Sequence, residues 1–543
     1  MKVTHGEAPS WPRWLPMPIR PARVAHAVLP AMEPSAVSMN DYVQRILSAR
    51  VYDVAIESPL DLMPRLSERL GAQVHLKRED LQPVFSFKLR GAYNKLVRLP
   101  RAVLDRGVIC ASAGNHAQGV ALAAKKLGVD AIIVMPRTTP SIKIEAVKRL
   151  GGTVVLHGDA FDEAQLKAKE IQAERDLTFI HPFDDPDVIA GQGTLGMEIL
   201  RQHPDPIEAI FVPIGGGGLA AGVAAFVKFL SPSTKVIGVE PTDAASMKAA
   251  LAAGELVMLD QVGLFADGVA VRQVGRETFR LCREFLDEVI TADTDAICAA
   301  IKDIFDDTRM IAEPSGALSL AGLKAYVERG GARTGSLIAI NSGANLNFDR
   351  LRTIAERAEV GEHREALLAV TIPETPGSYR QFIRTLGTRS ITEFNYRFAG
   401  PDSPARIFVG IGLARGEKEK QEVIALLRGA GYEVMDLSDN EMAKVHVRYM
   451  VGGRVPGLDN ELIYRFEFPE RPGALSRFLE SLAPEWNISL FHYRNHGADH
   501  GRVLAGIQVA PDTLTRFTQW LESLGYPYWD ETSNPAYRQF LAG

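Results

Sequence analysis

Lys88 is a residue of this sequence whose neighbours suggest catalysis. It stands in Ser86-Phe87-Lys88-Leu89-Arg90-Gly91-Ala92, directly after an aromatic residue and at the start of an apolar-periodic helix that Ser86 is placed to cap. A lysine buried beside an aromatic ring can have a lowered pKa and form a Schiff base with a carbonyl compound. A lone lysine near a helix start is more often a solvated surface charge, so this segment alone leaves both interpretations open.

Four consecutive glycines, Gly215–Gly218, follow an apolar strand and precede a helix over 219–230. Such a run costs conformational entropy, and its use is to let backbone N–H groups converge on an anion at a helix N-terminus. A flexible turn is the simpler alternative. The segment also satisfies the dinucleotide fingerprint as Gly216-x-Gly218-x-x-Ala221, with Glu240 at the end of the next strand, where an acid would hold a ribose. An NAD(P)-dependent oxidoreductase therefore remains an alternative on this segment.

Two further strand ends carry polar groups. In Ser112-Ala113-Gly114-Asn115-His116, small residues bring backbone N–H groups close to a carboxylate, and the Asn115 amide can donate to a phenolate oxygen. The alternative there is an ordinary Gly-Asn turn. Ser342, in Asn341-Ser342-Gly343-Ala344-Asn345, has a hydroxyl that could face a ring nitrogen or could cap the next helix.

These residues need a scaffold that brings strand ends together, and the sequence between about 50 and 345 predicts one. Short apolar, β-branched runs alternate with helical patterns, as in a parallel sheet that is buried on both faces. Open α/β sheets bind ligands at the carboxyl ends of their strands, which is where the glycine run, Asn115 and Ser342 fall. The candidate strands are 73–76, 107–111, 131–135, 153–156, 209–212, 236–239 and 336–340.

After about residue 350 an internal repeat replaces this pattern. Pro373-Glu374-Thr375-Pro376-Gly377 returns as Pro469-Glu470-Arg471-Pro472-Gly473, and Phe394-Asn395-Tyr396-Arg397 returns as Phe491-His492-Tyr493-Arg494. Each copy reads strand, helix, strand, strand, helix, strand, with Pro-Gly opening the first helix. The order predicts two small α+β units of the split βαβ kind.

Composition and charge restrict the function classes. The chain has 543 residues, enough for about three or four domains, and 46% apolar with 23% charged residues is typical of a soluble globular protein. A formal charge of −5 disfavours nucleic-acid and membrane-surface partners, which usually require a basic surface. No run approaches the ~20 apolar residues of a membrane span. Three cysteines cannot build a disulfide framework, which favours the cytoplasm.

Residues 1–38 differ from the rest of the chain. They are rich in proline and contain only two acids, Glu7 and Glu33, which predicts a disordered extension and not a signal peptide. Scarce serine argues against an organelle transit peptide. Met39 is a candidate start, because folded-looking sequence begins at Asn40.

Taken together, the motifs resemble one family. The combination of Ser-Phe-Lys-Leu-Arg-Gly-Ala, Ser-Ala-Gly-Asn-His, the tetraglycine and Ser-Gly-Ala-Asn is highly specific. It resembles the pyridoxal-phosphate enzymes of the tryptophan-synthase β-like fold (fold type II) and, within them, the biosynthetic threonine ammonia-lyases. The resemblance covers about 40–543, including Glu313-Pro314-Ser315-Gly316-Ala317. The domains that it implies are a two-lobed catalytic domain over 39–350 with its smaller lobe at about 89–190, a linker helix over 351–364, and two ferredoxin-like ACT-like subdomains over 365–445 and 446–543.

The resemblance also implies a role for each motif. Lys88 would bind the cofactor covalently and act in catalysis, with Phe87 packed near the ring, Asn115 bonded to the phenolic oxygen and Ser342 facing the ring nitrogen. The cofactor phosphate would be held by backbone amides of Gly215, Gly216, Gly217, Gly218 and Leu219. The substrate carboxylate would be held by Ser112 and the segment that follows it, namely Ala113, Gly114, Asn115 and His116.

The implied reaction converts L-threonine to 2-oxobutanoate and ammonia, with the freed amine of Lys88 as the Cα base and serine as a secondary substrate. Serine racemase, a relative, has a second serine where this chain has Ala113, so racemisation is disfavoured. Some relatives bind a metal through Glu240 and a later acid, but Ser246 occupies that later position here. No metal is therefore predicted.

The repeat is expected to regulate the enzyme, because catalysis needs no second pair of small domains. The resemblance implies a homotetramer that isoleucine inhibits and valine activates. Candidate effector residues are Tyr396, Arg397, Tyr493 and Arg494, since an arginine can clamp an amino-acid carboxylate. They could equally be ordinary strand residues. A non-catalytic amino-acid sensor would use the repeat alone, and the intact Lys88 motif argues against it.

Overall fold

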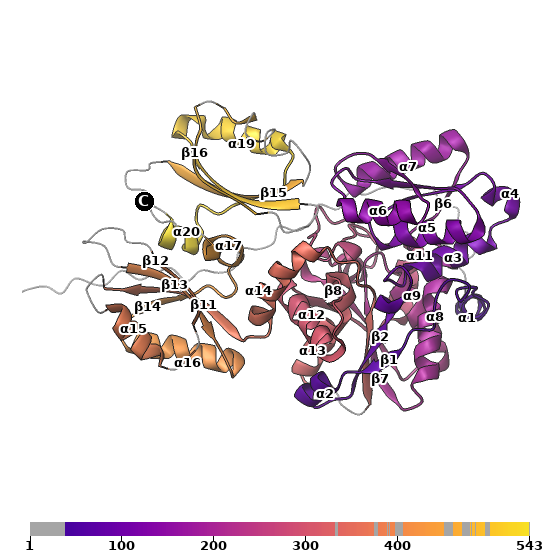
Figure 1. Ribbon diagram of the computed structural model, residues 1–543, viewed down its shortest axis with the longest axis horizontal. Coiled ribbons are helices and arrows are strands. Elements are labelled where there is room, and N and C mark those ends of the chain that lie inside the picture. Colours follow the sequence, from indigo (N-terminus) through magenta and orange to yellow (C-terminus); the bar gives the residue numbers. More distant parts are fainter. Residues whose placement is uncertain are drawn as a thin grey trace, which may run out of the picture.

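An α/β body is joined through helix α14 (Leu351–Gly361) to two small sheet units in the computed structural model (Figure 1). The N-terminal extension predicted at 1–38 lies outside the described residues apart from Ser38, which caps the first helix through a bond from the Asp41 N–H. The described residues are 38–331, 335–373, 378–387, 389, 391–396, 405–449, 460–469, 478, 481–483, 485–494 and 500–541.

The α/β body contains two sheets. The larger has the order β1-β2-β10-β7-β8-β9, and all its pairs are parallel except β1 with β2. Its strands are β1 (Leu60–Leu62), β2 (Val74–Arg78), β7 (Ile207–Pro213), β8 (Lys235–Pro241), β9 (Glu288–Ala292) and β10 (Ser336–Asn341). The smaller sheet is wholly parallel, in the order β5-β4-β3-β6. Its strands are β3 (Val108–Ala111), β4 (Ala131–Met135), β5 (Thr153–Leu156) and β6 (Thr178–Phe179).

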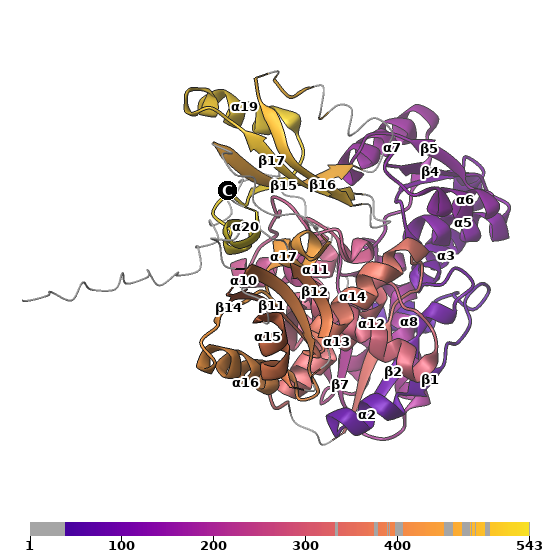
Figure 2. The same cartoon turned by 60° about the vertical axis from the view of Figure 1, so that its left-hand side comes forward.

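Helices cover both sheets, which confirms the predicted fold class (Figures 1 and 2). All seven predicted strands are present, while β1, β6 and β9 are additional. Apolar side chains of the large sheet and its helices form two buried clusters, as expected for a parallel sheet buried on both faces. The helices of this body are α1 (Met39–Leu47), α2 (Pro64–Leu70), α3 (Lys88–Arg98), α4 (Arg101–Leu104), α5 (Asn115–Leu127), α6 (Ser141–Arg149), α7 (Phe161–Arg175), α8 (Pro186–Gln202), α9 (Gly218–Leu230), α10 (Ser246–Ala253), α11 (Arg276–Phe285), α12 (Thr294–Thr308) and α13 (Pro314–Glu328).

The repeat forms two sheets of the same topology. The first has the order β12-β13-β11-β14 and the second β16-β17-β15-β18, with antiparallel pairs throughout. Phe382 and Phe478, which correspond in the repeat, are both fully buried in their own cores. Of the two Pro-Gly motifs, 374–377 and 470–473 lie outside the described residues. The elements are β11 (Glu365–Ile372), α15 (Ser378–Leu386), β12 (Ile391–Tyr396), β13 (Ala405–Gly412), α16 (Gly416–Gly429), β14 (Glu433–Asp436), α17 (Glu441–Val445), β15 (Glu461–Pro469), β16 (Asn487–Arg494), β17 (His500–Gln508), α19 (Leu514–Leu524), β18 (Tyr528–Asp530) and α20 (Pro535–Phe540).

One buried cluster joins the two repeat units to each other and to α14. It contains Val360 of α14, Phe408 of the first sheet, Leu504 of the second and Tyr537 of α20. Because apolar burial is the main favourable term in domain association, this cluster fixes the repeat units against α14. No helix within the described residues is both long and apolar enough to cross a membrane.

Candidate functional site

Lys88 opens α3, and its side chain is only partly accessible. Its Nζ donates to the Pro182 carbonyl at 3.0 Å and lies 5.3 Å from the centroid of the Phe87 ring. Burial lowers the pKa of the Lys88 amine to about 8, and the nearby Glu313 carboxylate opposes this shift. Near neutral pH, the neutral and nucleophilic form is therefore far more populated than in an exposed lysine.

The start of α3 is held by Ser342 and Gly343 and not by a cap from Ser86. The backbone of Ser86 bridges to Gly343, and the Phe87 N–H donates to the Ser342 carbonyl at 3.2 Å. Phe87 is the N-cap residue and makes no side-chain cap bond, so the predicted Ser86 cap is wrong. The backbone pairing directs Ser86 into the protein, where its hydroxyl is buried without a partner, and it brings the Lys88 segment against the strand end that carries Ser342.

The tetraglycine links β7 to α9, and three of its residues, Gly215, Gly216 and Gly217, are packed too closely to accept a side chain. A Cβ on Gly216 would lie 2.2 Å from the Phe183 ring, and one on Gly217, whose φ is +94°, would lie 2.9 Å from Thr278 Cβ. Gly217 is the N-cap residue of α9 and offers no side-chain cap. The first N–H groups of a helix have no partner within it, so this turn presents donors for an anion, as the sequence predicts.

The loop 181–185 connects the lysine to the glycine turn, and sequence reasoning missed it. The Pro182 carbonyl accepts from Lys88, while the adjacent Phe183 ring covers Gly216. The next residue, Asp184, accepts from three N–H groups at the start of α11 at 2.9–3.2 Å. The only sequence signal was the polar segment His181-Pro182-Phe183-Asp184-Asp185, which follows a short strand.

Asn115 is the first residue of α5, and its amide is held at both ends. Its Nδ2 donates to Glu313 Oε1 at 2.5 Å, and its Oδ1 accepts from Asn345 Nδ2 at 2.6 Å. An amide nitrogen carries two hydrogens, so one donor remains after the Glu313 bond. The sequence indicated Asn115, whereas Glu313, 198 positions away, was noted only as part of the Glu313–Ala317 motif and was given no role.

The other residues of the Asn115 segment differ in what they offer. The Gly114 N–H donates to the Ser112 hydroxyl at 3.2 Å, and a Cβ on Gly114 would meet nothing within 4 Å, so there is open space beside this backbone. Ala113 shares the partial exposure of its neighbours. The ring of His116 instead turns inward, with Nε2 2.9 Å from the Ile180 carbonyl. Burial lowers the pKa of His116 to about 3, so its ring is neutral.

Ser342 is almost fully buried, and its hydroxyl donates to the Ser315 carbonyl at 3.1 Å. The next helical turn is capped by the Asn347 side chain, so Ser342 does not cap it. The Ser342 oxygen keeps lone pairs for a further partner.

Glu240 does not serve the role that the oxidoreductase alternative requires. Its carboxylate is fully buried and accepts from the N–H groups of Met247 at 2.7 Å and Lys248 at 2.9 Å. Both oxygens therefore bind the start of α10, and burial raises the pKa of Glu240 to about 7. An acid that holds a ribose must instead face the ligand, so the dinucleotide interpretation of this segment is wrong.

The candidate effector residues can be placed only by their backbone. Tyr396 ends β12 and pairs with Ile407, whereas Tyr493 and Arg494 end β16 and pair with Val503 and Arg502. In both units this strand is the edge of its sheet. Arg397 and the side chains of Tyr396, Tyr493 and Arg494 lie outside the described residues.

Charged side chains connect the repeat to the α/β body at α14. Arg357 donates to Asp295 of α12 at 2.6 Å and to both oxygens of Glu441 at 2.9 Å. Glu441, the first residue of α17, also accepts from Arg502 of β17 at 2.8 Å. A carboxylate of the first repeat copy is thus paired with both α14 and the second copy, and Arg357 extends the connection to α12.

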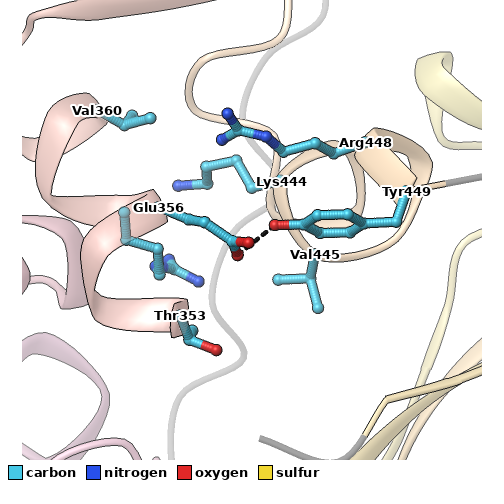
Figure 3. A pocket seen from close by; sticks show the side chains of 8 residues that line it. Thr353, Glu356, Val360, Lys444, Val445, Arg448 and Tyr449 are labelled. Atoms are coloured by element: carbon cyan, nitrogen blue, oxygen red, sulfur yellow. Dashed lines mark hydrogen bonds between the residues drawn. The ribbon is translucent and has the colours of Figure 1, made fainter. Parts of the chain in front are cut away.

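A small pocket lies at this junction, between α14 and the segment 441–449 (Figure 3). The Tyr449 hydroxyl reaches across it and donates to Glu356. Lys444 donates to Asp295 at 2.5 Å and Arg448 to Glu365 at 3.0 Å, so the basic side chains around the pocket are paired with acids.

Lys88, the glycine turn, Asn115 and Ser342 fit pyridoxal phosphate. The cofactor carries an aldehyde that a neutral amine can bind, a phosphate suited to the α9 N-terminus and a phenolic oxygen suited to an amide donor. The glycine turn cannot carry side chains, so its backbone can approach such a phosphate.

Comparison with known proteins agrees with this fit. A family model described as a pyridoxal-phosphate dependent enzyme matches residues 52–343, and one described as the C-terminal regulatory domain of threonine dehydratase matches 356–447 and 452–541. The biosynthetic L-threonine dehydratase IlvA of Burkholderia multivorans is 58% identical over 509 residues, which are 93% of this chain and 100% of that protein. The mitochondrial threonine dehydratase of Saccharomyces cerevisiae is 51% identical over 531 residues, covering 95% and 92%.

Solved structures of similar proteins match about three fifths of the chain. The processed form of threonine deaminase isoform 2 from Solanum lycopersicum has a TM-score of 0.58 and 55% identity, covering 59% of this chain and 88% of that one. Maize serine racemase has a TM-score of 0.55 and 32% identity, covering 60% and 98%.

Proposed function

The chain belongs to the biosynthetic threonine dehydratases, pyridoxal-phosphate enzymes with a C-terminal regulatory domain, and from this premise we propose that its Lys88 site converts L-threonine to 2-oxobutanoate and ammonia. The reaction is the first step of isoleucine biosynthesis. The observation that carries the proposal is the buried Lys88 amine, joined through Pro182 and Phe183 to the glycine turn. The family excludes the oxidoreductase and the non-catalytic sensor.

Each residue of the site has a part in this reaction. Pyridoxal phosphate, when bound, supplies an electron sink for the Cα–H bond. Backbone N–H groups of Gly215–Leu219 would bind its phosphate, Asn115 would donate to its phenolic oxygen, and Ser342 would contact its ring nitrogen. Phe87 packs beside the ring.

Proton movement falls to Lys88. As a neutral amine, its Nζ would accept the Cα proton, and the resulting ammonium would return a proton to the departing β-hydroxyl, which leaves as water. The released enamine would then take up water to give the keto acid and ammonia. Substrate carboxylate binding is assigned to Ser112, Ala113, Gly114, Asn115 and His116. His116 can contribute only backbone, because its ring is turned towards Ile180.

Specificity within the family follows from the same segment. Ala113 has no hydroxyl to protonate the opposite face of Cα, so elimination is favoured over racemisation. L-serine has the same β-hydroxyl as threonine and is proposed as a secondary substrate.

The repeat is proposed to bind isoleucine as inhibitor and valine as activator through Tyr396, Arg397, Tyr493 and Arg494. Support comes from the equivalent backbone positions of the two tyrosines at the ends of edge strands. We further propose the domain limits 39–350, 351–364, 365–445 and 446–543, a homotetramer and a cytoplasmic location. The three cysteines, all buried and free, suit a reducing compartment.

The catalytic proposal is tested by Lys88→Ala. We expect the variant to lose both the visible absorbance of lysine-bound cofactor and the formation of 2-oxobutanoate. Lys126→Ala, which removes an exposed lysine of α5, is the matched control and should retain both. Turnover by Lys88→Ala at the wild-type rate would refute the assignment.

The regulatory proposal is tested by ending the chain after residue 364. This limit keeps Glu362, which pairs with Lys324 and Arg69 at 3.2 Å in the α/β body. We expect the truncated enzyme to deaminate threonine without inhibition by isoleucine. Inhibition that persists in the truncated enzyme would place the effector site elsewhere.

A further inference from the structure

Glu313 is a buried acid that the proposed reaction does not yet use. It precedes α13 and is 3% exposed. Its carboxylate crosses to α5, where Oε1 accepts from Asn115 at 2.5 Å. Burying a charged group is costly unless it has a partner and a purpose, so its position calls for an explanation.

Capping of α13 does not explain why the Glu313 carboxylate is buried. Glu313 is the N-cap residue of that helix, yet its side chain makes no cap hydrogen bond. Its N–H donates to the Gly343 carbonyl at 3.1 Å, and a side-chain hydrogen bond with Ser315 is its local side-chain contact. The carboxylate thus does not cap α13, and its shortest hydrogen bond is to Asn115, at the start of α5.

The surrounding backbone leaves room for this carboxylate. A Cβ on Gly343 would lie 2.6 Å from Glu313 Oε1, so a residue other than glycine would displace it. Gly343 belongs to the same segment as Ser342, which pairs with the start of α3. The glycine of the Ser-Gly-Ala-Asn motif thus admits Glu313 beside Asn115.

The charges that face Glu313 come from three elements. Lys88 of α3 is close enough for the carboxylate to act on its pKa. On the far side lies Asp267, paired with Lys143 of α6 at 2.6 Å. Burial raises the pKa of Glu313, the Asp267 carboxylate raises it further, and the Asn115 bond and Lys143 oppose them.

The Asn115 amide is fixed by this acid together with Asn345. Asn345 donates to Asn115 Oδ1 at 2.6 Å and to the Val84 carbonyl at 2.8 Å. With Oδ1 and one N–H engaged, the amide cannot flip, and its second N–H has a single direction. A donor that is already oriented need not be ordered when the cofactor binds or during turnover.

We propose that Glu313 is a positioning residue for the reaction, which acts by fixing the Asn115 amide so that its remaining N–H is directed at the phenolic oxygen of the cofactor. This inference rests on the proposed cofactor position beside Lys88. Asn345 acts on the other end of the same amide.

The test compares Glu313→Ala with Glu313→Gln in the holoenzyme. Glutamine keeps an oxygen that accepts from Asn115, whereas alanine removes it. We expect Glu313→Ala to lower kcat about 100-fold, the scale of a misplaced catalytic contact, with a smaller change in KM. The visible spectrum of the bound cofactor should shift and its dissociation constant should rise. Glu313→Gln should restore the spectrum, the cofactor affinity and most of kcat.

Controls separate positioning from folding. Glu328→Ala, at the exposed end of α13, should behave as wild type. If Glu313→Ala does not fold, Asn345→Ala carries the test, because it frees the other end of the amide and should shift the spectrum in the same direction. Two results would overturn the proposal: an unchanged spectrum and kcat in the alanine variant that folds, or equal losses in Glu313→Ala and Glu313→Gln.

Failure of the proposed function would look different. If the proposed function is wrong, the Lys88→Ala variant should keep both the cofactor absorbance and the turnover of threonine. If Lys88→Ala loses both while Glu313→Ala keeps both, only the role of Glu313 is refuted.

Discussion

Lys88 experiences two opposing influences, and their balance predicts how the enzyme takes up its cofactor. Burial lowers the pKa of the amine to about 8, although Glu313 opposes the shift. Only the neutral amine attacks an aldehyde. The rate at which apoenzyme regains visible absorbance should therefore rise about tenfold per pH unit below this pKa and level off above it. Stopped-flow absorbance against pH measures this dependence. A rate that keeps rising up to the ordinary lysine pKa of about 10.4 would contradict the lowered value.

Ser342 allows a second test at the residue scale. A neutral hydroxyl beside the ring nitrogen stabilises a protonated ring less than a carboxylate would, so it should favour elimination over transamination. Ser342→Asp should change the cofactor absorbance and raise side reactions, measured by spectroscopy and by analysis of products. Ser342→Ala is the control without a new charge. Unchanged absorbance and products in Ser342→Asp would remove the argument.

Residues that work through a local motif were predictable, and residues that work through contact at a distance were not. Lys88 and the glycine turn carry their chemistry within a few positions of the sequence. Glu313 gains its meaning only from Asn115, 198 positions away, and Phe183 gains its meaning from packing on Gly216. Neither pair has a spacing that a sequence pattern could show, because the fold creates the contact.

Strands and helix caps were likewise predictable where a local sequence pattern marks them and not where the fold creates the contact. Buried parallel strands such as β3 and β4 are continuous apolar runs, which makes them visible in the sequence. The short strands β1 and β6 of the α/β body contain three and two residues, too few for any periodicity. The strand β9 was missed because its polar residues Glu288 and Thr291 leave only two consecutive apolar residues between them. The predicted cap of α3 failed because a backbone bridge to Gly343, made by the fold, replaced the local signal.

The turn between β7 and α9 supports a prediction at the scale of an element. Gly216→Ala would place a Cβ 2.2 Å from the Phe183 ring, so either the ring or the turn must move. The N–H groups at the start of α9 would then no longer converge on the cofactor phosphate. We expect the dissociation constant of pyridoxal phosphate to rise at least about tenfold, roughly 1.4 kcal/mol, measured by titration of the apoenzyme.

A control and a suppressor sharpen this test. Gly429→Ala lies at the end of α16 where a Cβ would meet nothing within 4 Å, and it should not affect cofactor binding. Replacing the Phe183 ring by the smaller leucine side chain should restore part of the affinity for pyridoxal phosphate when Phe183→Leu is combined with Gly216→Ala. Wild-type affinity in Gly216→Ala alone would show that the ring can yield without moving the turn.

In the whole molecule, α14 is the element through which the α/β body and the repeat are held together (Figure 2). It packs against α12 on one side and shares the apolar cluster of the repeat on the other through Val360. Its Arg357 lies between Asp295 and Glu441. Any effect of the repeat on catalysis has a short physical connection here, because α12 belongs to the core of the α/β body.

Glu441 is paired with both Arg357 of α14 and Arg502 of β17, so its loss should weaken the association of the repeat units with α14. Glu441→Gln removes the charge and one acceptor, which leaves two guanidinium groups close together with a weaker partner. The Glu441 side chain is 34% exposed, so solvent screening limits the loss of stability to about 1–2 kcal/mol. We expect unfolding monitored by tryptophan fluorescence to begin at lower denaturant, because Trp486, Trp520 and Trp529 all lie in the second repeat unit.

The matched control for Glu441→Gln is Glu485→Gln, which breaks the exposed ion pair with Arg516 on the second repeat unit. Exposed pairs contribute little, so this variant should unfold as wild type does. If isoleucine acts through the repeat, Glu441→Gln should also need a higher isoleucine concentration for half inhibition, since a ligand transmits its effect only through contacts that differ between states. A variant with unchanged unfolding and unchanged inhibition would show that the apolar cluster around Val360 couples the two parts without the ionic bridge.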